Sequence, residues 1–227
     1  IGVLMAGWAS ANITPARSVA LSGQFHTRIS KSVQDPITAT ALALDNGGDR
    51  AVMVSLDVIS IPGKLMEAVR ARLKTALPEF DGRNLLLNAT HTHTAPGLVE
   101  TSYKPYDTSD DPSVMRPAEY AEFFTDRVAQ AAAEAWTNRK PAGLSWGLGF
   151  ASVGMNRRAS YASGKSVMYG NTRDAGFSHV EGYRDDAVEM LILVDADRKP
   201  TGVVVNVACT SQETEHIKEV SADFWHE

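Results

Sequence analysis

The first half of the chain alternates between hydrophobic patterns typical of strands and of helices. Apolar-rich runs at residues 38–44 and 51–59 predict two strands, and the Asp-Asn-Gly-Gly run between them predicts the turn of a β-hairpin. Apolar residues then recur at every fourth position over residues 65–77, which predicts a helix with one buried face. Residues 84–92 (NLLLNATHT) include consecutive leucines, and such an unbroken apolar run is typical of a strand buried on both faces.

The second half of the chain has one very regular helical pattern. The alanine- and glutamate-rich residues 117–138 begin with a proline and place their apolar side chains on one face, which predicts a helix. The polar residues 98–117 and 156–184 predict two long loops, a kind of segment that often carries function. The remaining apolar runs predict strands, of which the last two form a hairpin: residues 144–152, 187–195 and 201–209.

This alternation of strands and helices predicts an α/β fold, with layered mixed β-sheets flanked by helices. The length of 227 residues agrees with a single domain over residues 1–227, because domains usually contain roughly 100–200 residues. The chain ends shortly after Ser221, which has the properties of a helix N-cap followed by a first turn with no helix-ending residue. We therefore expect a C-terminally incomplete domain, that is, a segment of a longer protein.

Charge and composition narrow the range of partners. The formal charge of -5, from 22 Lys and Arg against 27 Asp and Glu, gives no general attraction to nucleic acid or to an anionic membrane surface. No run approaches the ~20 apolar residues of a transmembrane helix. The single cysteine, Cys209, cannot form a disulfide within the chain. We expect a small-molecule or lipid substrate, no nucleic acid and no transmembrane segment, and the sequence does not determine the oligomeric state.

Residues 88–98 (NATHTHTAPGL) are the clearest candidate for a chemical site. His91 and His93 are two positions apart, so on extended backbone both side chains leave the same face and can bind one metal ion. They follow the most apolar strand, and the carboxyl ends of strands in open α/β sheets usually hold ligands and catalytic groups. Histidine is a usual neutral ligand of zinc, which makes Zn2+ the first candidate. The alternative is that both are polar residues at a strand end with local hydrogen bonds.

The same run resembles the A-T-H-T-H-S-G-P-G signature of the neutral/alkaline non-lysosomal ceramidase family. Residues 35–58 (DPITATALALDNGGDRAVMVSLDV) are similar to the D-P-L-x-A-R-A-L-V-L-D-x-G-x-x-R-x-x-L-V-S-L-D pattern of that family. The likeness covers essentially the whole chain as a series of collinear motifs, which also includes AGWASANITP (6–15), residues 118–147, MNRR (155–158), VVVNVACTSQ (203–212) and VSAD (220–223).

The resemblance implies a hydrolase in which zinc and its bound water cleave the N-acyl amide of ceramide or of a related lipid. It implies that His91 is a zinc ligand and that His93 handles protons beside it, although His93 is equally open to a role as a second metal ligand. It also implies that Arg157, in the N-R motif, lies on the substrate side, where a guanidinium can stabilise an oxyanion. Family members are frequently exported, so the resemblance favours a secreted or periplasmic location.

One departure from the family leaves a second function open. Thr210 stands where the family commonly carries another metal-ligand histidine, and the family's ligand glutamate and tyrosine would lie beyond Glu227. His216 can replace the missing histidine only if the chain bends back after Thr210. The alternative function is therefore a catalytically degenerate, ceramidase-like domain that binds a glycan, a lipid or a protein.

Other polar residues complete the predicted site. Asp57 interrupts an apolar strand, and a buried carboxylate needs a partner, so we expect it to orient a ligand histidine through the free ring N–H. A position at a bulge or strand end is the alternative for Asp57. Gly23, His26 and Arg28 lie in a polar stretch after an apolar one, and we assign them to the substrate-binding rim of the pocket.

Overall fold

A computed structural model describes residues 3–99 and 111–226. The described chain forms two compact units. The first contains the residues up to 143 together with 195–199 and the residues from 211 onward, and the second contains 144–194 and 200–210. Within the described residues no helix is long and apolar enough to cross a membrane.

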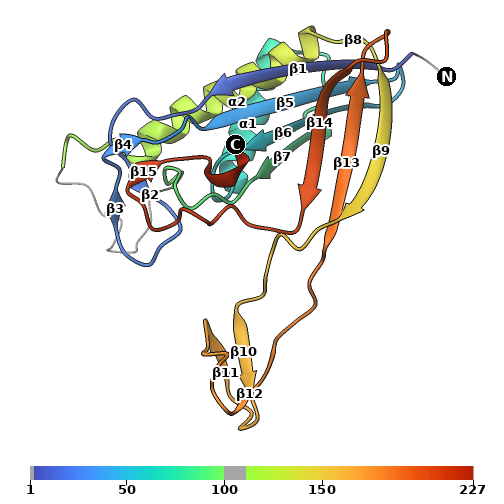
Figure 1. Ribbon diagram of the computed structural model, residues 1–227. Coiled ribbons are helices and arrows are strands. Elements are labelled where there is room, and N and C mark those ends of the chain that lie inside the picture. The colour runs from blue at the N-terminus through green and yellow to red at the C-terminus, as the bar shows by residue number, and fades with distance from the viewer. Residues whose placement is uncertain (1–2, 100–110, 227) are drawn as a thin grey trace. The chain divides into compact units, whose positions relative to one another are not determined.

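The first unit is built on a five-stranded sheet of order β7-β6-β5-β1-β8 (Figure 1). Its strands pair antiparallel except for β6 and β7, which run parallel. The predicted hairpin is confirmed, because β5 and β6 pair from Ala39 with Leu56 to Asp45 with Arg50. The strands are β1 (Met5–Asn12), β5 (Thr38–Asp45), β6 (Arg50–Leu56), β7 (Leu85–Ala89) and β8 (Lys140–Pro141).

Two helices cover one face of this sheet, and both agree with the sequence prediction (Figure 1). Helix α1 (Gly63–Ala76) connects the parallel strands β6 and β7 and buries Val69 and Leu73, which are four residues apart and therefore share a face. Helix α2 (Pro117–Thr137) packs across β1, β5 and β6 and against α1. The mixed sheet with helices on its face confirms the predicted α/β class.

The contact between α2 and the sheet is very close because small residues line it. A Cβ atom on Gly7 of β1 would lie 2.2 Å from the carbonyl oxygen of Ala135, so only glycine fits there. At the other end of α2, the buried Tyr120 donates its hydroxyl hydrogen to the carbonyl oxygen of Ile13 over 2.7 Å. These contacts fix α2 along the sheet.

Strand β7 differs from its prediction in both length and burial. It ends at Ala89 rather than continuing through Thr92, and it lies at the edge of the sheet. Leu85 is 2% exposed, whereas the adjacent Leu86 is 52% exposed. The expectation of a strand buried on both faces was therefore wrong, because an edge strand with helices on one face leaves its alternate side chains uncovered.

Short elements connect the remaining parts of the first unit. Strands β2 and β3 pair antiparallel, and β4 pairs parallel with β15, which joins residues 32–33 to the C-terminal segment. These elements are β2 (Ala20–Leu21), β3 (Arg28–Ile29), β4 (Ser32–Val33), β15 (Glu219–Val220) and the 3₁₀ turns at Gly82–Asn84 and Asp223–Trp225. The predicted loop over residues 98–117 falls mostly outside the described residues.

The second unit contains two three-stranded sheets, of orders β14-β13-β9 and β11-β10-β12. The predicted hairpin of β13 and β14 is confirmed. The expectation of an irregular loop over residues 156–184 was wrong, because those residues form β10, β11 and β12. These strands have three or four residues each, too few to show a period in the sequence. The strands are β9 (Gly143–Phe150), β10 (Arg158–Tyr161), β11 (Ser166–Met168), β12 (Phe177–Val180), β13 (Ala187–Val194) and β14 (Pro200–Val207).

Candidate functional site

The two histidines lie in a loop that leaves the carboxyl end of β7. After Ala89 the backbone still forms hydrogen bonds with the end of β6 and with the residues that follow it. The His91 N–H, for example, donates to the carbonyl oxygen of Val58 over 3.1 Å. His91 then adopts a φ of 64°, in the left-handed region. The ring centroids of His91 and His93 are 5.1 Å apart. The rings lie close together, but a left-handed turn brings them there and not the alternation of an extended strand. Their shared binding of one metal ion stays a prediction.

His91 is fixed by a backbone group. Its Nδ1 lies 2.7 Å from the carbonyl oxygen of Ile59. A carbonyl oxygen only accepts, so Nδ1 carries a hydrogen, and no hydrogen bond to Nε2 is found among the described residues. In its neutral form the half-buried imidazole would therefore present the Nε2 lone pair, which is the arrangement that histidine ligands of metals usually have.

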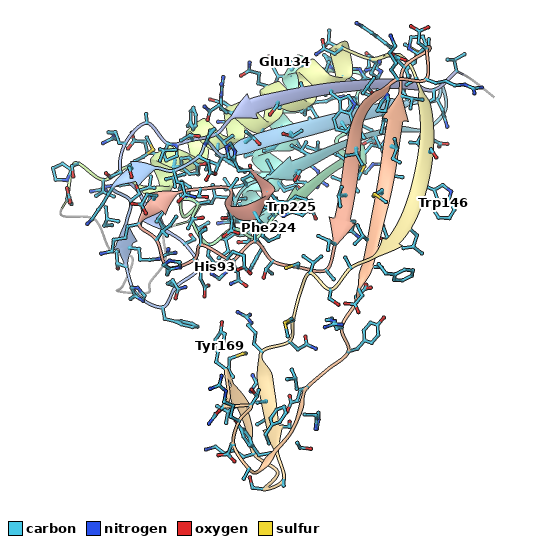
Figure 2. The ribbon with its side chains drawn as sticks, in the orientation of Figure 1. His93, Glu134, Trp146, Tyr169, Phe224 and Trp225 are labelled. Atoms are coloured by element: carbon cyan, nitrogen blue, oxygen red, sulfur yellow. The ribbon has the colours of Figure 1, made fainter. Side chains whose placement is uncertain are left out.

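His93, which is labelled in Figure 2, is 8% exposed, and two side chains from the segment after β14 contact its ring. Its Nδ1 lies 3.1 Å from the carboxylate oxygen Oε2 of Glu215, and its Nε2 lies 2.8 Å from the amide nitrogen of Gln212. Burial, followed by the charge of His91, lowers the pKa of His93 below 6.5, while the carboxylate of Glu215 opposes this shift. His93 is therefore predominantly neutral at pH 7.

The threonines of the T-H-T-H run explain the shape of the loop. Thr92 and Thr94 are fully buried, and both hydroxyl groups donate to the carbonyl oxygen of Ser221, over 3.1 and 2.9 Å. The Ser221 side chain in turn donates to the buried carboxylate of Asp35 over 2.7 Å. The loop with the histidines is thus attached to the C-terminal segment, whose Phe224 and Trp225 are labelled in Figure 2.

Asp57 does not have the role expected of it. Its carboxylate accepts hydrogen bonds from the Thr38 backbone N–H over 2.8 Å, from the Thr38 hydroxyl and from the Thr90 hydroxyl. Burial raises the pKa of Asp57, although these hydrogen bonds act in the opposite direction. Among the described residues it is the Ile59 carbonyl, and not Asp57, that orients the His91 ring. Within the described residues, Asp57 is joined to the histidine loop through Thr90, the residue before His91.

The predicted rim residues separate into three different environments. Gly23 has a φ of +104°, and a Cβ atom there would lie 2.3 Å from Cγ of His93, so glycine is required beside the ring. His26 is exposed. Arg28 is 2% exposed and donates to backbone carbonyl oxygens, which include those of Glu215 and His93. The assignment of Arg28 to a substrate-facing rim was therefore wrong, since its guanidinium is bound to the backbone inside the unit.

A small cavity lies next to the histidine loop. It has a volume of about 240 Å³ and is lined by residues that include Gly23, which contacts His93, and Ile59, whose carbonyl binds His91. Ser22, Ser60 and Leu98 also line it. The cavity thus combines apolar surface with hydroxyl groups at the edge of the site.

Gln212 and Glu215 are the site residues that sequence reasoning missed. The chain does bend back after Thr210, as a replacement ligand would require, but it brings these two side chains to His93 while His216 is exposed. No local pattern marks them, because the partners are more than 100 residues from His93 along the chain. An amide and an acidic residue that follow the last predicted strand, residues 201–209, are the signal that the sequence offers.

Arg157 and Thr210 belong to the second unit. The Arg157 guanidinium donates to the hydroxyl of Tyr169, which is labelled in Figure 2, over 2.6 Å and lies over the Tyr169 ring. Both arginine and tyrosine are on the exposed surface of that unit. The expected role of Arg157 toward a substrate stays a prediction.

Comparison with known proteins identifies the fold. No protein-family model matches the sequence, and no curated protein matches it. The crystal structure of neutral ceramidase from Pseudomonas aeruginosa has a TM-score of 0.73 and 23% sequence identity, over 98% of this chain and 34% of that chain. A ceramidase complexed with C2 has a TM-score of 0.70 and 22% identity, with the same coverage of both chains. The chain therefore has a neutral-ceramidase-like fold, and it spans 34% of the length of these ceramidases.

Proposed function

We propose that this chain carries part of the active site of a hydrolase that cleaves an N-acyl amide, such as that of a ceramide-like lipid. In this proposal His91 is a zinc ligand, and His93 accepts a proton and returns it to the departing amine. The observation that carries the proposal is the hydrogen bond from His91 Nδ1 to the Ile59 carbonyl oxygen, because it leaves the Nε2 lone pair available to a metal. The fold shared with neutral ceramidases supports the choice of an amide substrate.

The described residues fit a part of a zinc site. His91 offers one unengaged ring nitrogen, whereas both ring nitrogens of His93 face side chains of the 212–215 segment. Catalytic zinc commonly has three protein ligands, and no group of three or more His, Cys, Asp or Glu side chains suited to a metal occurs among the described residues. The proposal therefore assigns one ligand, His91, to this part of the protein. Bound zinc would polarise the amide carbonyl and lower the pKa of a water molecule.

The protein's own groups favour proton transfer by His93. A neutral imidazole with an unprotonated Nε2 can accept a proton, and burial keeps His93 neutral at pH 7. The Glu215 carboxylate lies at Nδ1, on the other side of the ring, where it would stabilise the imidazolium after transfer. Of the two roles open to His93 from the sequence, these contacts support the proton-handling role over that of a second metal ligand.

A second function is favoured by a separate observation. Thr210, which replaces a histidine of the resembled family, is exposed, and the Gln212 amide covers the Nε2 atom of His93. Both features suit a domain that kept the fold but lost the metal. In that case the protein would bind a lipid, a glycan or a protein without hydrolysis.

Metal analysis of the purified full-length protein distinguishes the two functions. We expect about one equivalent of zinc, removed by a chelator together with hydrolysis of an N-acyl amide substrate. His91→Ala should abolish zinc binding, while the control His179→Ala, which changes an exposed histidine of the second unit, should leave it unchanged. Stoichiometric zinc in His91→Ala would contradict the site, and a zinc-free wild-type protein under zinc-replete conditions would support the binding function.

A further inference from the structure

The contacts around His93 determine which of its ring nitrogens carries the hydrogen. Glu215 Oε2 lies 3.1 Å from Nδ1 of His93 and 3.3 Å from the amide nitrogen of Gln212. A carboxylate only accepts, so the Gln212 side chain must turn its NH₂ group toward Glu215. That same NH₂ group lies 2.8 Å from His93 Nε2 and 3.0 Å from Nδ1, and it can only donate. Only Nδ1 also faces a carboxylate acceptor, that of Glu215, so among the described residues the contacts favour Nδ1 as the donor and Nε2 as the acceptor of the ring.

We infer that Glu215 is a positioning residue for His93, which holds the imidazole in the Nδ1–H form and leaves the acceptor lone pair on Nε2. The inference rests on the proposed function, in which His93 accepts a proton. A neutral imidazole has one donor and one acceptor nitrogen, and the hydrogen bond made by one nitrogen sets the state of the other. Because His93 is buried, its contact with the Glu215 carboxylate acts in a medium of lower dielectric constant than water, where it is stronger.

Arg28 fixes the backbone on both sides of this pair. Its guanidinium donates to the carbonyl oxygens of Glu215, over 2.7 Å, and Ile217, over 2.9 Å. It also donates to the carbonyl oxygens of His93 and of Ser22. One planar cation thus joins the loop of His93 to the segment of Glu215 and sets the distance between them. Lysine cannot reproduce this contact, because its ammonium is a compact point charge without the fork of donors.

The tautomer of His93 can be measured by nitrogen-15 NMR of the ring, in purified protein treated with a chelator, at a pH where the imidazole is neutral. In the wild-type protein we expect the proton on Nδ1. Glu215→Ala removes the acceptor at Nδ1, so the ratio of the Nδ1–H to the Nε2–H form should fall several-fold. Glu215→Gln keeps an acceptor oxygen and should restore part of that ratio.

Two further variants complete the experiment. Glu213→Ala changes an exposed carboxylate on the same segment and should leave the tautomer unchanged, which makes it the matched control. Arg28→Lys should shift the tautomer in the same direction as Glu215→Ala, and circular dichroism shows whether each variant is folded. A wild-type tautomer ratio in folded Glu215→Ala, or an Nε2–H form in the wild-type protein, would overturn the inference.

This measurement requires neither zinc nor substrate, so it separates the inference from the proposed function. If His91 binds no zinc but Glu215→Ala still changes the tautomer, the hydrolase proposal fails and the positioning of His93 stands. If the protein hydrolyses an N-acyl amide, Glu215→Ala should lower kcat about 10- to 100-fold with little change in KM. An unchanged kcat in that variant would overturn the role of Glu215 in positioning His93 for catalysis.

Discussion

At the scale of single residues, Gly23 is the position most sensitive to a small change. Its φ of +104° is unfavourable for any residue with a Cβ atom, and that atom would overlap the His93 ring. We expect Gly23→Ala to lower the free energy of unfolding by about 1–2 kcal/mol for the backbone and a further ~1–3 kcal/mol for overpacking. Denaturant unfolding measures the sum, and the His93 ring resonances should shift.

Gly47 offers a matched control for this substitution. It has a similar φ of +88°, but nothing lies within 4 Å of its Cβ position. Gly47→Ala should therefore show the backbone cost alone, about 1–2 kcal/mol. If the two variants lost the same stability, the close packing of Gly23 on His93 would be disproved.

The same scale shows which site residues a sequence can predict. His91 and His93 could be predicted, because the H-x-H spacing is local and the loop after β7 does bring the rings together. The groups that contact the two imidazole rings could not be predicted. Gln212 and Glu215 reach His93 from far along the chain, and the Ile59 carbonyl has no side-chain signature.

At the scale of elements, strand β7 provides a direct test of its edge position. Leu85→Ala should cost about 2–5 kcal/mol, because it removes a core side chain that is 2% exposed. Leu86→Ala on the neighbouring residue should cost about 0.5 kcal/mol or less, since that side chain is 52% exposed. Thermal or denaturant unfolding of the two variants gives the comparison. Equal losses of stability in the two variants would contradict the exposed position of Leu86 and would support a strand buried on both faces.

The elements also show where hydrophobic patterns succeed and where they fail. Helices α1 and α2 are long enough for the helical spacing of apolar residues to recur several times, so their buried faces could be predicted from the sequence. Strand β9 carries large apolar side chains on its exposed face, including Trp146 at 74% exposure, so its apolar content does not report burial (Figure 2). The strands β10 to β12 are short, and their pairing with one another defines them where a sequence pattern does not.

At the scale of the whole molecule, acid should weaken the attachment of the C-terminal segment. Burial acts to raise the pKa of Asp223, but hydrogen bonds from Thr214, Phe224 and Glu213 outweigh it and leave that pKa below 3.8. A carboxylate with a lowered pKa in the folded state stabilises the protein above pH 3.8, and this contribution is lost as the pH falls through the folded-state pKa.

Asp223→Asn tests this contribution. Asparagine also tolerates the φ of 60° found at this position, so the change removes mainly the charge and two acceptor sites. At neutral pH the variant should be about 1–3 kcal/mol less stable than the wild-type protein, and the difference should narrow below pH 3.8. A difference that stays constant over this pH range would assign the loss to packing instead of charge.

The carbonyl of Ile59 has a consequence for how such proteins diverge. Every amino acid supplies a main-chain oxygen, so mutation at position 59 can alter the side chain without abolishing the group that orients His91. Selection for that orientation would act on the path of the chain after β6 and leave the identity of the residue free. Distant relatives could thus keep the carbonyl group that orients His91 while sharing no amino acid identity at position 59.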